Sequence, residues 1–503
     1  MQILHEDKDR KIIPRWRSFH RELIAGELRP LKQLEEPIKL PKEFLDEKID
    51  SWRENKTLTH ATDLVSSALV LGHESEVIDV AKFILSKPQR GNEISHIIAK
   101  RALGIEVENN DIAVCPEILD ITQNRKKIHE LKIRLQEEPR NVFTLNDIAL
   151  LYESLGFYEQ SEKAINRALQ IVPDCRYILR SAARLHIHHE NGRMAHRLLW
   201  SNERTLYDPW LLSAEIAVAS AIGKTSRFVK AARLMIESNE FQPFHISELA
   251  SAIATLEFEA GNVKRARKYF EQSLLTPTEN AVAQVSWALR MDANLGIRGN
   301  PQVKAPVSHE ALAWEYNRNA KWDETVSEAY QWLMDQSFSS RPAILGSYVL
   351  AVAKQDYEKS MEIAYLGLIA NPNDFTLINN YAFAAVQANH LDKAKREFYR
   401  IDQTTLSTKN KIVWLATSGL IKYREGLPKE GNQLYIQSIE LAKNESKLAC
   451  MALFNFALEE IRINSNESEE YRKKAIESIS LSPFADLKLL IKRLEKQKSS
   501  VST

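Results

Sequence analysis

The sequence has few cysteines, few glycines and no excess of one charge. Cys115, Cys175 and Cys450 are far apart, odd in number and outside any CxxC motif, which argues against a disulfide framework and a structural zinc site. With 15 glycines among 503 residues, few turns need positive φ, so long helices with short loops are favoured. Lys and Arg total 68 and Asp and Glu total 67, so the basic excess typical of nucleic-acid binders is missing.

Long hydrophobic runs are missing as well. No stretch of about 18 apolar residues is free of charge, so no membrane-spanning helix is predicted. The opening residues, MQILHEDKDRKIIP, contain no apolar run of signal-peptide length. Hydrophobic residues make up 44 % and charged residues 27 % of the chain, as in soluble folded proteins. We therefore expect a cytoplasmic protein whose cysteines are buried small side chains in a reducing compartment.

Motifs of catalysis are also missing. The string GKT at 223–225 is not a phosphate-binding loop, because Val218 stands where that loop requires glycine and the surrounding residues predict a helix. The HIHHE cluster at 186–190 would bind a metal only with a further ligand, for which His196 is the candidate; half-buried packing of His186 is the alternative. The sequence has no HExxH motif and no GxSxG elbow. We therefore predict no enzymatic activity and no cofactor or metal site.

Small and apolar residues instead follow a repeating pattern of paired helices. Residues 142–175 read VFTLNDIALLYESLGFYEQSEKAINRALQIVPDC, and Gly156 separates a first from a second helical set. The residues that define the unit are Leu145, Ile148, Ala149, Tyr152, Ser161, Ile165, Ala168 and Pro173. Small residues at Ala149 and Ser161 let the two helices approach closely. One such hairpin cannot bury its apolar faces alone, so successive units must stack.

This pattern resembles the tetratricopeptide repeat, W-x2-L-G-x2-Y, A-x3-F and P on a 34-residue period, with Leu145 replacing Trp and Ala149 replacing Gly. The template also fits from residues 176, 247, 306, 341, 375 and 412. The starts at 142 and 176, and at 341 and 375, are one period apart. The resemblance predicts an all-α solenoid of stacked antiparallel helix hairpins, a tetratricopeptide-like superhelix in one or two blocks.

The repeats suggest a division of the chain into six parts. Proline and glycine interrupt the helical pattern around residue 300, which makes this stretch the best linker or long loop. The predicted parts are a non-repeat N-terminal arm (1–57), a divergent helical repeat region (58–137), a solenoid block (138–296), the linker (297–308), a second solenoid block (309–485) and a C-terminal capping helix and tail (486–503).

The N-terminal arm mixes basic and aromatic residues in the stretch RKIIPRWRSFHRELIAGELRPL. We favour an arm that packs Trp16 and Phe19 on the first repeats, with solvated arginines. An arm that docks a partner is the second hypothesis, and nucleic-acid binding through stacking and phosphate contacts is the third.

In tetratricopeptide proteins the first helices line a concave surface, and the resemblance implies that template positions 2, 5, 9 and 12 face inward. Aromatic residues and arginine dominate binding hot spots. The predicted partner-binding residues are Asn146, Glu153, Arg180, Arg184, Glu310, Trp314, Asn317, Asn379, Phe383 and Tyr423. We therefore expect a scaffold or adaptor that binds one or more proteins. The alternatives are a regulatory subunit that gates an associated enzyme or effector and, less favoured because of the neutral charge, a helical-repeat RNA binder.

Overall fold

The regular elements of the described chain are helices. The computed structural model describes residues 10–17, 42–88, 93–105, 121–238, 240–297, 308–482 and 487–501. None of the residues in these ranges belongs to a β-strand, so the predicted all-α fold is confirmed. Within the same ranges, no helix is long and apolar enough to cross a bilayer.

The helices form two compact units. The N-terminal unit consists of Asp7–Ala311 with Met334–Gln336, and the described residues of the C-terminal unit come from Leu312–Leu333 and Ser337–Thr503. Of the linker predicted at 297–308, only the two end residues lie inside the described ranges.

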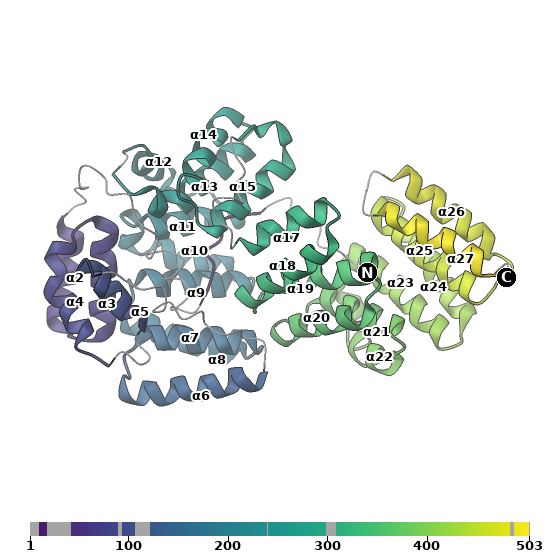
Figure 1. The fold of residues 1–503 in the computed structure, drawn as a ribbon, viewed down its shortest axis with the longest axis horizontal. Helices are drawn as coiled ribbons and strands as arrows, with labels where there is room; N and C mark the ends of the chain where they lie inside the picture. The colour runs from purple at the N-terminus through teal and green to yellow at the C-terminus, as the bar shows by residue number, and fades with distance from the viewer. Residues whose placement is uncertain are drawn as a thin grey trace. The chain divides into compact units, whose positions relative to one another are not determined.

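The N-terminal unit begins with the helices that precede the clear repeats and continues with the first repeat block (Figure 1). Its elements are α2 (Lys42–Glu54), α3 (Leu58–Leu71), η1 (Glu74–Val77), α4 (Ile78–Leu85), α5 (Glu93–Ala102), α6 (Ile121–Glu137), α7 (Val142–Ser154), α8 (Tyr158–Ile171), α9 (Arg176–His188), α10 (Gly192–Trp200), η3 (Glu203–Leu206), α11 (Pro209–Ala221), α12 (Val229–Glu237), α13 (Pro243–Glu259), α14 (Val263–Ser273), α15 (Glu279–Met291) and η4 (Ala293–Leu295).

Two further helices, α17 and α18, contribute residues to both units, and the helices after them belong to the C-terminal unit. These elements are α17 (His309–Arg318), α18 (Trp322–Asp335), α19 (Ser340–Val349), the π-helical turn η5 (Leu350–Lys354), α20 (Tyr357–Ala370), α21 (Phe375–Gln387), α22 (Leu391–Phe398), η6 (Gln403–Thr405), α23 (Thr408–Arg424), α24 (Pro428–Leu441), α25 (Ser446–Arg462), α26 (Ser468–Leu481) and α27 (Lys488–Val501).

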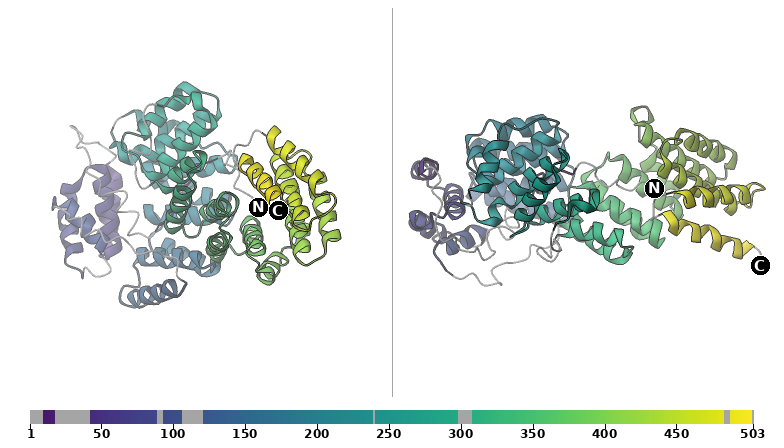
Figure 2. Two further views of the ribbon diagram at one scale, coloured as in Figure 1. Left: turned by 45° about the vertical axis from the view of Figure 1, so that its right-hand side comes forward. Right: turned by 90° about the horizontal axis from the view of Figure 1, so that it is seen from above.

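Each unit is a stack of helix hairpins. Consecutive helices pack as pairs, as in α7 with α8, α13 with α14 and α23 with α24. The first helix of one hairpin also packs against the first helix of the next, as in α13 with α15, α21 with α23 and α23 with α25. The hairpins of the C-terminal unit, green to yellow, follow one another in Figures 1 and 2. The chain is therefore a tetratricopeptide-like α-solenoid, as the repeat pattern predicted.

The helix starts follow the predicted register closely. Helices α7, α9 and α21 begin at residues 142, 176 and 375, which are the starts that the template predicted. The units placed at 247 and 412 begin four residues earlier, at Pro243 and Thr408. Proline suits the first turn of a helix, and the Ser407 side chain caps α23 by accepting from the backbone N–H of Asn410. Local capping chemistry thus extends these first helices beyond the repeat template.

Small buried residues bring the two helices of a hairpin together. The hydroxyl of Ser161 in α8 donates to the carbonyl oxygen of Ala149 in α7 at 2.9 Å. In the C-terminal unit, Ser360 of α20 donates in the same way to the carbonyl of Ser347 in α19 at 2.8 Å. All four residues are buried, so the small side chain and the satisfied hydroxyl both permit the close contact.

Two glycines serve the same purpose in the α23–α24 hairpin. A methyl group added at Gly431 would lie 2.9 Å from the carbonyl oxygen of Gly419 and 2.5 Å from Cδ2 of Tyr423. The Tyr423 ring is buried, and its hydroxyl donates to Glu460. The ring therefore has little freedom to move away from an added methyl group.

We predict that Gly431→Ala destabilises the chain even though alanine is the better helix former. Overpacking a filled contact costs about 1–3 kcal/mol, whereas the helix preference returns at most about 1 kcal/mol. Thermal unfolding followed by circular dichroism should show a lower midpoint for this variant. Gln433→Ala, at an exposed position of the same helix, is the matched control and should leave the midpoint unchanged. A Gly431→Ala midpoint at or above that of the wild type would contradict the close contact.

Candidate functional site

Residues Arg10–Arg17, which we call the N-terminal segment, form an extended stretch within the N-terminal unit. Arg10, Ile12, Pro14 and Trp16 are all buried, as expected when side chains of an extended chain point alternately to opposite sides. Trp16 is 0 % and Ile12 is 1 % exposed. Trp16 thus packs inside the unit, whereas Phe19, the other aromatic residue of the predicted arm, lies outside the described residues.

Side-chain amides of two first helices bind the main chain of the N-terminal segment. The Nδ2 atom of Asn280 on α15 donates to the carbonyl oxygen of Ile13 at 3.0 Å. Gln284, one turn further along α15, donates to the carbonyl of Arg10 at 2.7 Å. Asn146 on α7 donates to the carbonyl of Arg17 at 3.4 Å. These contacts engage main-chain atoms that every peptide carries.

Asn146 makes a second contact that recognises a side chain. The indole Nε1 of Trp16 donates to Oδ1 of Asn146 at 3.0 Å, so one amide reads both the tryptophan and the carbonyl that follows it. A buried indole N–H needs such an acceptor.

The prediction that the arginines of the arm are solvated is wrong for Arg10 and Arg17, which are buried. The basic side chains of the N-terminal segment pair with carboxylates from four helices. The Nε and Nη2 atoms of Arg10 each donate to one oxygen of Glu310 on α17 at 3.0 Å, a bidentate pair. Arg15 donates to the same Glu310 at 3.0 Å and to Asp335 on α18 at 3.1 Å. The remaining pairs are Arg17 with Asp335 at 2.8 Å, Arg17 with Glu279 on α15, and Lys11 with Glu259 on α13.

The charge pairs at Arg17 outweigh the cost of burying it. Burial by itself lowers the pKa of the Arg17 guanidinium, but the neighbouring carboxylates of Asp335 and Glu279 raise that pKa above its usual value. The side chains of Arg17 and Asp335 are 9 % and 6 % exposed, so this ion pair is shielded from solvent and only weakly screened by salt.

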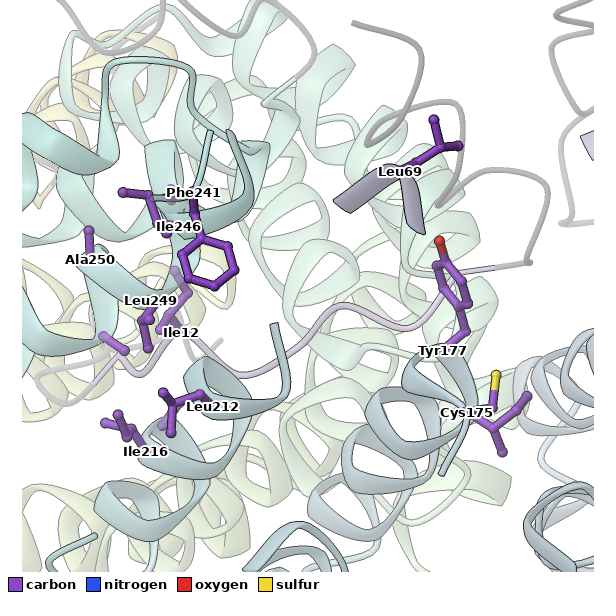
Figure 3. Packing of buried hydrophobic residues seen from close by; sticks show 14 of the residues in the cluster. Ile12, Leu69, Cys175, Tyr177, Leu212, Ile216, Phe241, Ile246, Leu249 and Ala250 are labelled. Carbon is purple, nitrogen blue, oxygen red and sulfur yellow. The ribbon is translucent and has the colours of Figure 1, made fainter. Parts of the chain in front are cut away.

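Apolar packing fixes the middle of the N-terminal segment. Ile12 belongs to the same hydrophobic cluster as Leu212 and Ile216 of α11 and Leu249 of α13. Figure 3 shows the segment passing these helices, with Ile12 beside Leu249 and Leu212. The segment therefore combines an apolar anchor, main-chain contacts and ion pairs, which are the elements of peptide recognition.

Of the ten predicted partner-binding residues, Asn146 and Glu310 contact the N-terminal segment. Arg180 lies one contact away, because its Nη2 donates at 3.0 Å to Glu248, which in turn accepts from Asn280 at 3.5 Å. Glu153 is buried elsewhere in the unit and accepts from His189, and Arg184 is half-buried on α9.

The five predicted residues numbered above 310 lie in the C-terminal unit. Trp314, Phe383 and Tyr423 are buried, with Trp314 2 % exposed. Asn379 is buried and accepts from the hydroxyl of Thr417 at 2.7 Å, whereas Asn317 is half-buried. As partner contacts, these five residues remain predictions.

The sequence did not identify Glu259, Glu279, Asn280, Gln284 and Asp335. No repeat unit was predicted to start at Glu279, although Val282, Val285, Ser286 and Leu289 occupy the apolar and small template positions. Thr278 also caps α15 by accepting from the backbone N–H of Ala281. Asp335 ends a second helix, where the template predicts no inward position. A signal was available in the segment itself, because a row of basic residues that folds inward requires acidic partners.

Two histidines of the HIHHE cluster lie beside one oxygen of Glu153, whereas His196 lies beside another carboxylate. His189 Nε2 lies 2.8 Å from an oxygen of Glu153, and this hydrogen bond raises the pKa of His189. His188 lies 3.4 Å from the same oxygen, but burial lowers its pKa to about 3. His196 instead lies 3.3 Å from Glu215. Among the described residues, no group of three or more potential ligands could hold a metal ion.

A buried histidine in α13 couples stability to pH. His245 is 2 % exposed, and its Nδ1 accepts from the indole N–H of Trp210 at 3.3 Å. Burial lowers the pKa of His245 to about 3, so the imidazole stays neutral in the folded chain. The unfolded chain takes up a proton near pH 6.5. The contribution of His245 to stability is therefore fully present above pH 6.5 and is lost as the pH falls towards 3.

We predict that stability falls as the pH is lowered from 7 to 5, with a slope of up to about 1.4 kcal/mol per pH unit for each such histidine. In His245→Gln, whose amide can accept from Trp210 without titrating, urea unfolding should depend less steeply on pH. His129→Gln, at an exposed position, should retain the wild-type slope. The same slope in His245→Gln and wild type would contradict the assignment.

No family model matches the sequence, and no curated protein matches it. Among solved structures, the chain is similar to the APC/C hetero-tetramer Cut9–Hcn1, with 11 % identity, 90 % of this chain and 92 % of that chain covered, and a TM-score of 0.33. It is also similar to yeast Tom70, with 14 % identity, 89 % of this chain and 97 % of that chain covered, and a TM-score of 0.29. A tetratricopeptide repeat protein from Parabacteroides merdae is 12 % identical, with 55 % of this chain and 98 % of that chain covered and a TM-score of 0.25. At such values, the helix pairing and repeat register described above carry the fold assignment.

Proposed function

We propose that the chain is a cytoplasmic protein-interaction scaffold that binds an extended segment of a partner protein along the first helices of its hairpins, and that it acts by binding rather than by catalysis. The observation that carries this proposal is the N-terminal segment, which Asn146, Asn280 and Gln284 hold through main-chain carbonyl oxygens. Because these donors engage atoms common to all peptides, they suit a polypeptide from another protein equally well.

The charges around the site favour a protein partner over nucleic acid. Arg10, Arg15 and Arg17 of the segment face Glu279, Glu310 and Asp335 rather than solvent. Lys11 pairs with Glu259 at the surface. A phosphate backbone would meet these carboxylates as like charges, whereas a basic polypeptide would complement them.

The C-terminal unit offers a second set of proposed contacts. Asn379 stands at template position 5 of its repeat, the position that Asn146 occupies in the N-terminal unit. We propose Asn317, Trp314, Phe383 and Tyr423 as further contacts of the C-terminal unit, because they also stand at inward template positions. For the same reason we propose Arg184 as a contact of the N-terminal unit.

A photo-crosslinking experiment in the native host tests the proposal. Arg184 on α9 and Asn317 on α17 are half-buried on first helices, so each can be replaced by a photoreactive amino acid with little disturbance to the core. We predict that illumination joins these two positions to a polypeptide partner. Arg167 on α8 and Ser327 on α18 are exposed on second helices and serve as controls that should give several-fold less adduct. Adducts formed with RNA, or formed mainly from the control positions, would contradict the proposal.

A further inference from the structure

The N-terminal segment is joined to the solenoid as a ligand would be, rather than as a part of a hairpin. Its contacts reach residues far along the chain, from Asn146, 129 positions beyond Arg17, to Asp335, 320 positions beyond Arg15. The helices that supply these contacts form through their own local hydrogen bonds and capping. The segment therefore belongs to no hairpin of the repeat pattern.

The side-chain contacts of the segment define a chemical pattern. Two regions of positive charge, at Arg10 and at Arg15 with Arg17, flank the apolar centre that contains Ile12. Trp16 adds a large aromatic side chain whose indole N–H has its own acceptor. The carbonyl contacts set the backbone path, and these side chains set the sequence preference.

The geometry points to an intramolecular ligand: we infer that the N-terminal segment occupies the binding site in competition with a partner protein, and that the partner supplies an extended segment of the same basic and apolar chemistry. This inference rests on the proposed function. It names the class of partner sequence and adds a regulatory step, because the partner must displace the chain's own residues before it binds.

The buried carboxylates explain why the partner segment must be basic. The side chains of Glu310 and Asp335 are each 6 % exposed while the segment is bound. A neutral replacement would cover them without neutralising them, and leaving a buried charge uncompensated is strongly unfavourable. Only an occupant with correctly spaced cations can take the place of Arg10, Arg15 and Arg17.

Competition within one chain makes the observed affinity depend on the segment. The apparent dissociation constant of a partner equals its intrinsic value divided by the fraction of molecules whose site is open. If the segment fills the site in about nine of ten molecules, its release strengthens partner binding by about tenfold.

The test uses the full chain and a labelled peptide with the sequence of residues 8–20. The variant Arg10→Ala with Arg15→Ala and Arg17→Ala weakens the attachment of the chain's own segment and changes no residue of the solenoid helices. Fluorescence anisotropy should show that this variant binds the peptide about tenfold or more tightly than the wild type. A peptide with the same residues in scrambled order carries the same charge and should not bind comparably. Full-length Ile12→Ala with Trp16→Ala retains all the basic residues and should give the same direction of change if the triple variant does not fold.

The second arm of the test removes the acceptors. In the triple variant, Glu310→Gln with Asp335→Asn should weaken the peptide by about tenfold or more, because two of the charge partners are lost. Equal affinity of the peptide for wild type and both segment variants would overturn the inference, as would unchanged affinity after the two acceptors are neutralised. If crosslinks from Arg184 and Asn317 persist in that case, the scaffold function stands and only the competition is refuted.

Discussion

The close approach of two helices within each hairpin is the constraint on which the rest of the structure depends. Ser161 against Ala149 and Gly431 against Gly419 allow contacts that a larger side chain would prevent. Within each unit, this approach fixes the spacing between first helices that pack on one another, as α13 packs on α11 and on α15. The positions of Asn146, on one first helix, and of the amides on α15 follow from that spacing. The contacts between the two helices of a hairpin thus determine where the side-chain amides on the first helices lie.

The N-terminal segment follows a different physical rule from the solenoid that surrounds it. The hairpins are stabilised by apolar contacts between neighbours in the sequence, whereas the segment depends on ion pairs and amide contacts over long sequence separations. The two kinds of interaction meet at Ile12, which extends the hydrophobic cluster of α11 and α13 into the segment. The segment and the polar and apolar groups that hold it are therefore parts of one polypeptide.

Local patterns predicted the hairpins, because each repeat is set by small, apolar and turn residues within 34 positions. The same template identified Asn146 and Glu310, since both stand at positions that it directs inward. It did not identify Asn280 or Gln284, because no unit was predicted to start at Glu279, although that start would place Asn280 at the inward template position 2. No local pattern links residues 10–17 to helices hundreds of positions away, so the composition of the arm indicated packing without revealing its partners. Pairings of this kind depend on the finished fold.

The arrangement of charges around Arg15 has a consequence for how the arginines attach the N-terminal segment. Arg15 lies between Glu310 and Asp335, and Arg17 lies between Asp335 and Glu279. Cations and anions therefore alternate, and each inner group serves two neighbours. Withdrawing Arg15 removes one pairing partner from Glu310 and one from Asp335, although Arg10 still pairs with Glu310 and Arg17 still pairs with Asp335. Because neighbouring arginines share a carboxylate, their contributions to the attachment of the segment are coupled and not additive. The number and spacing of the positive charges therefore matter more than the overall net charge.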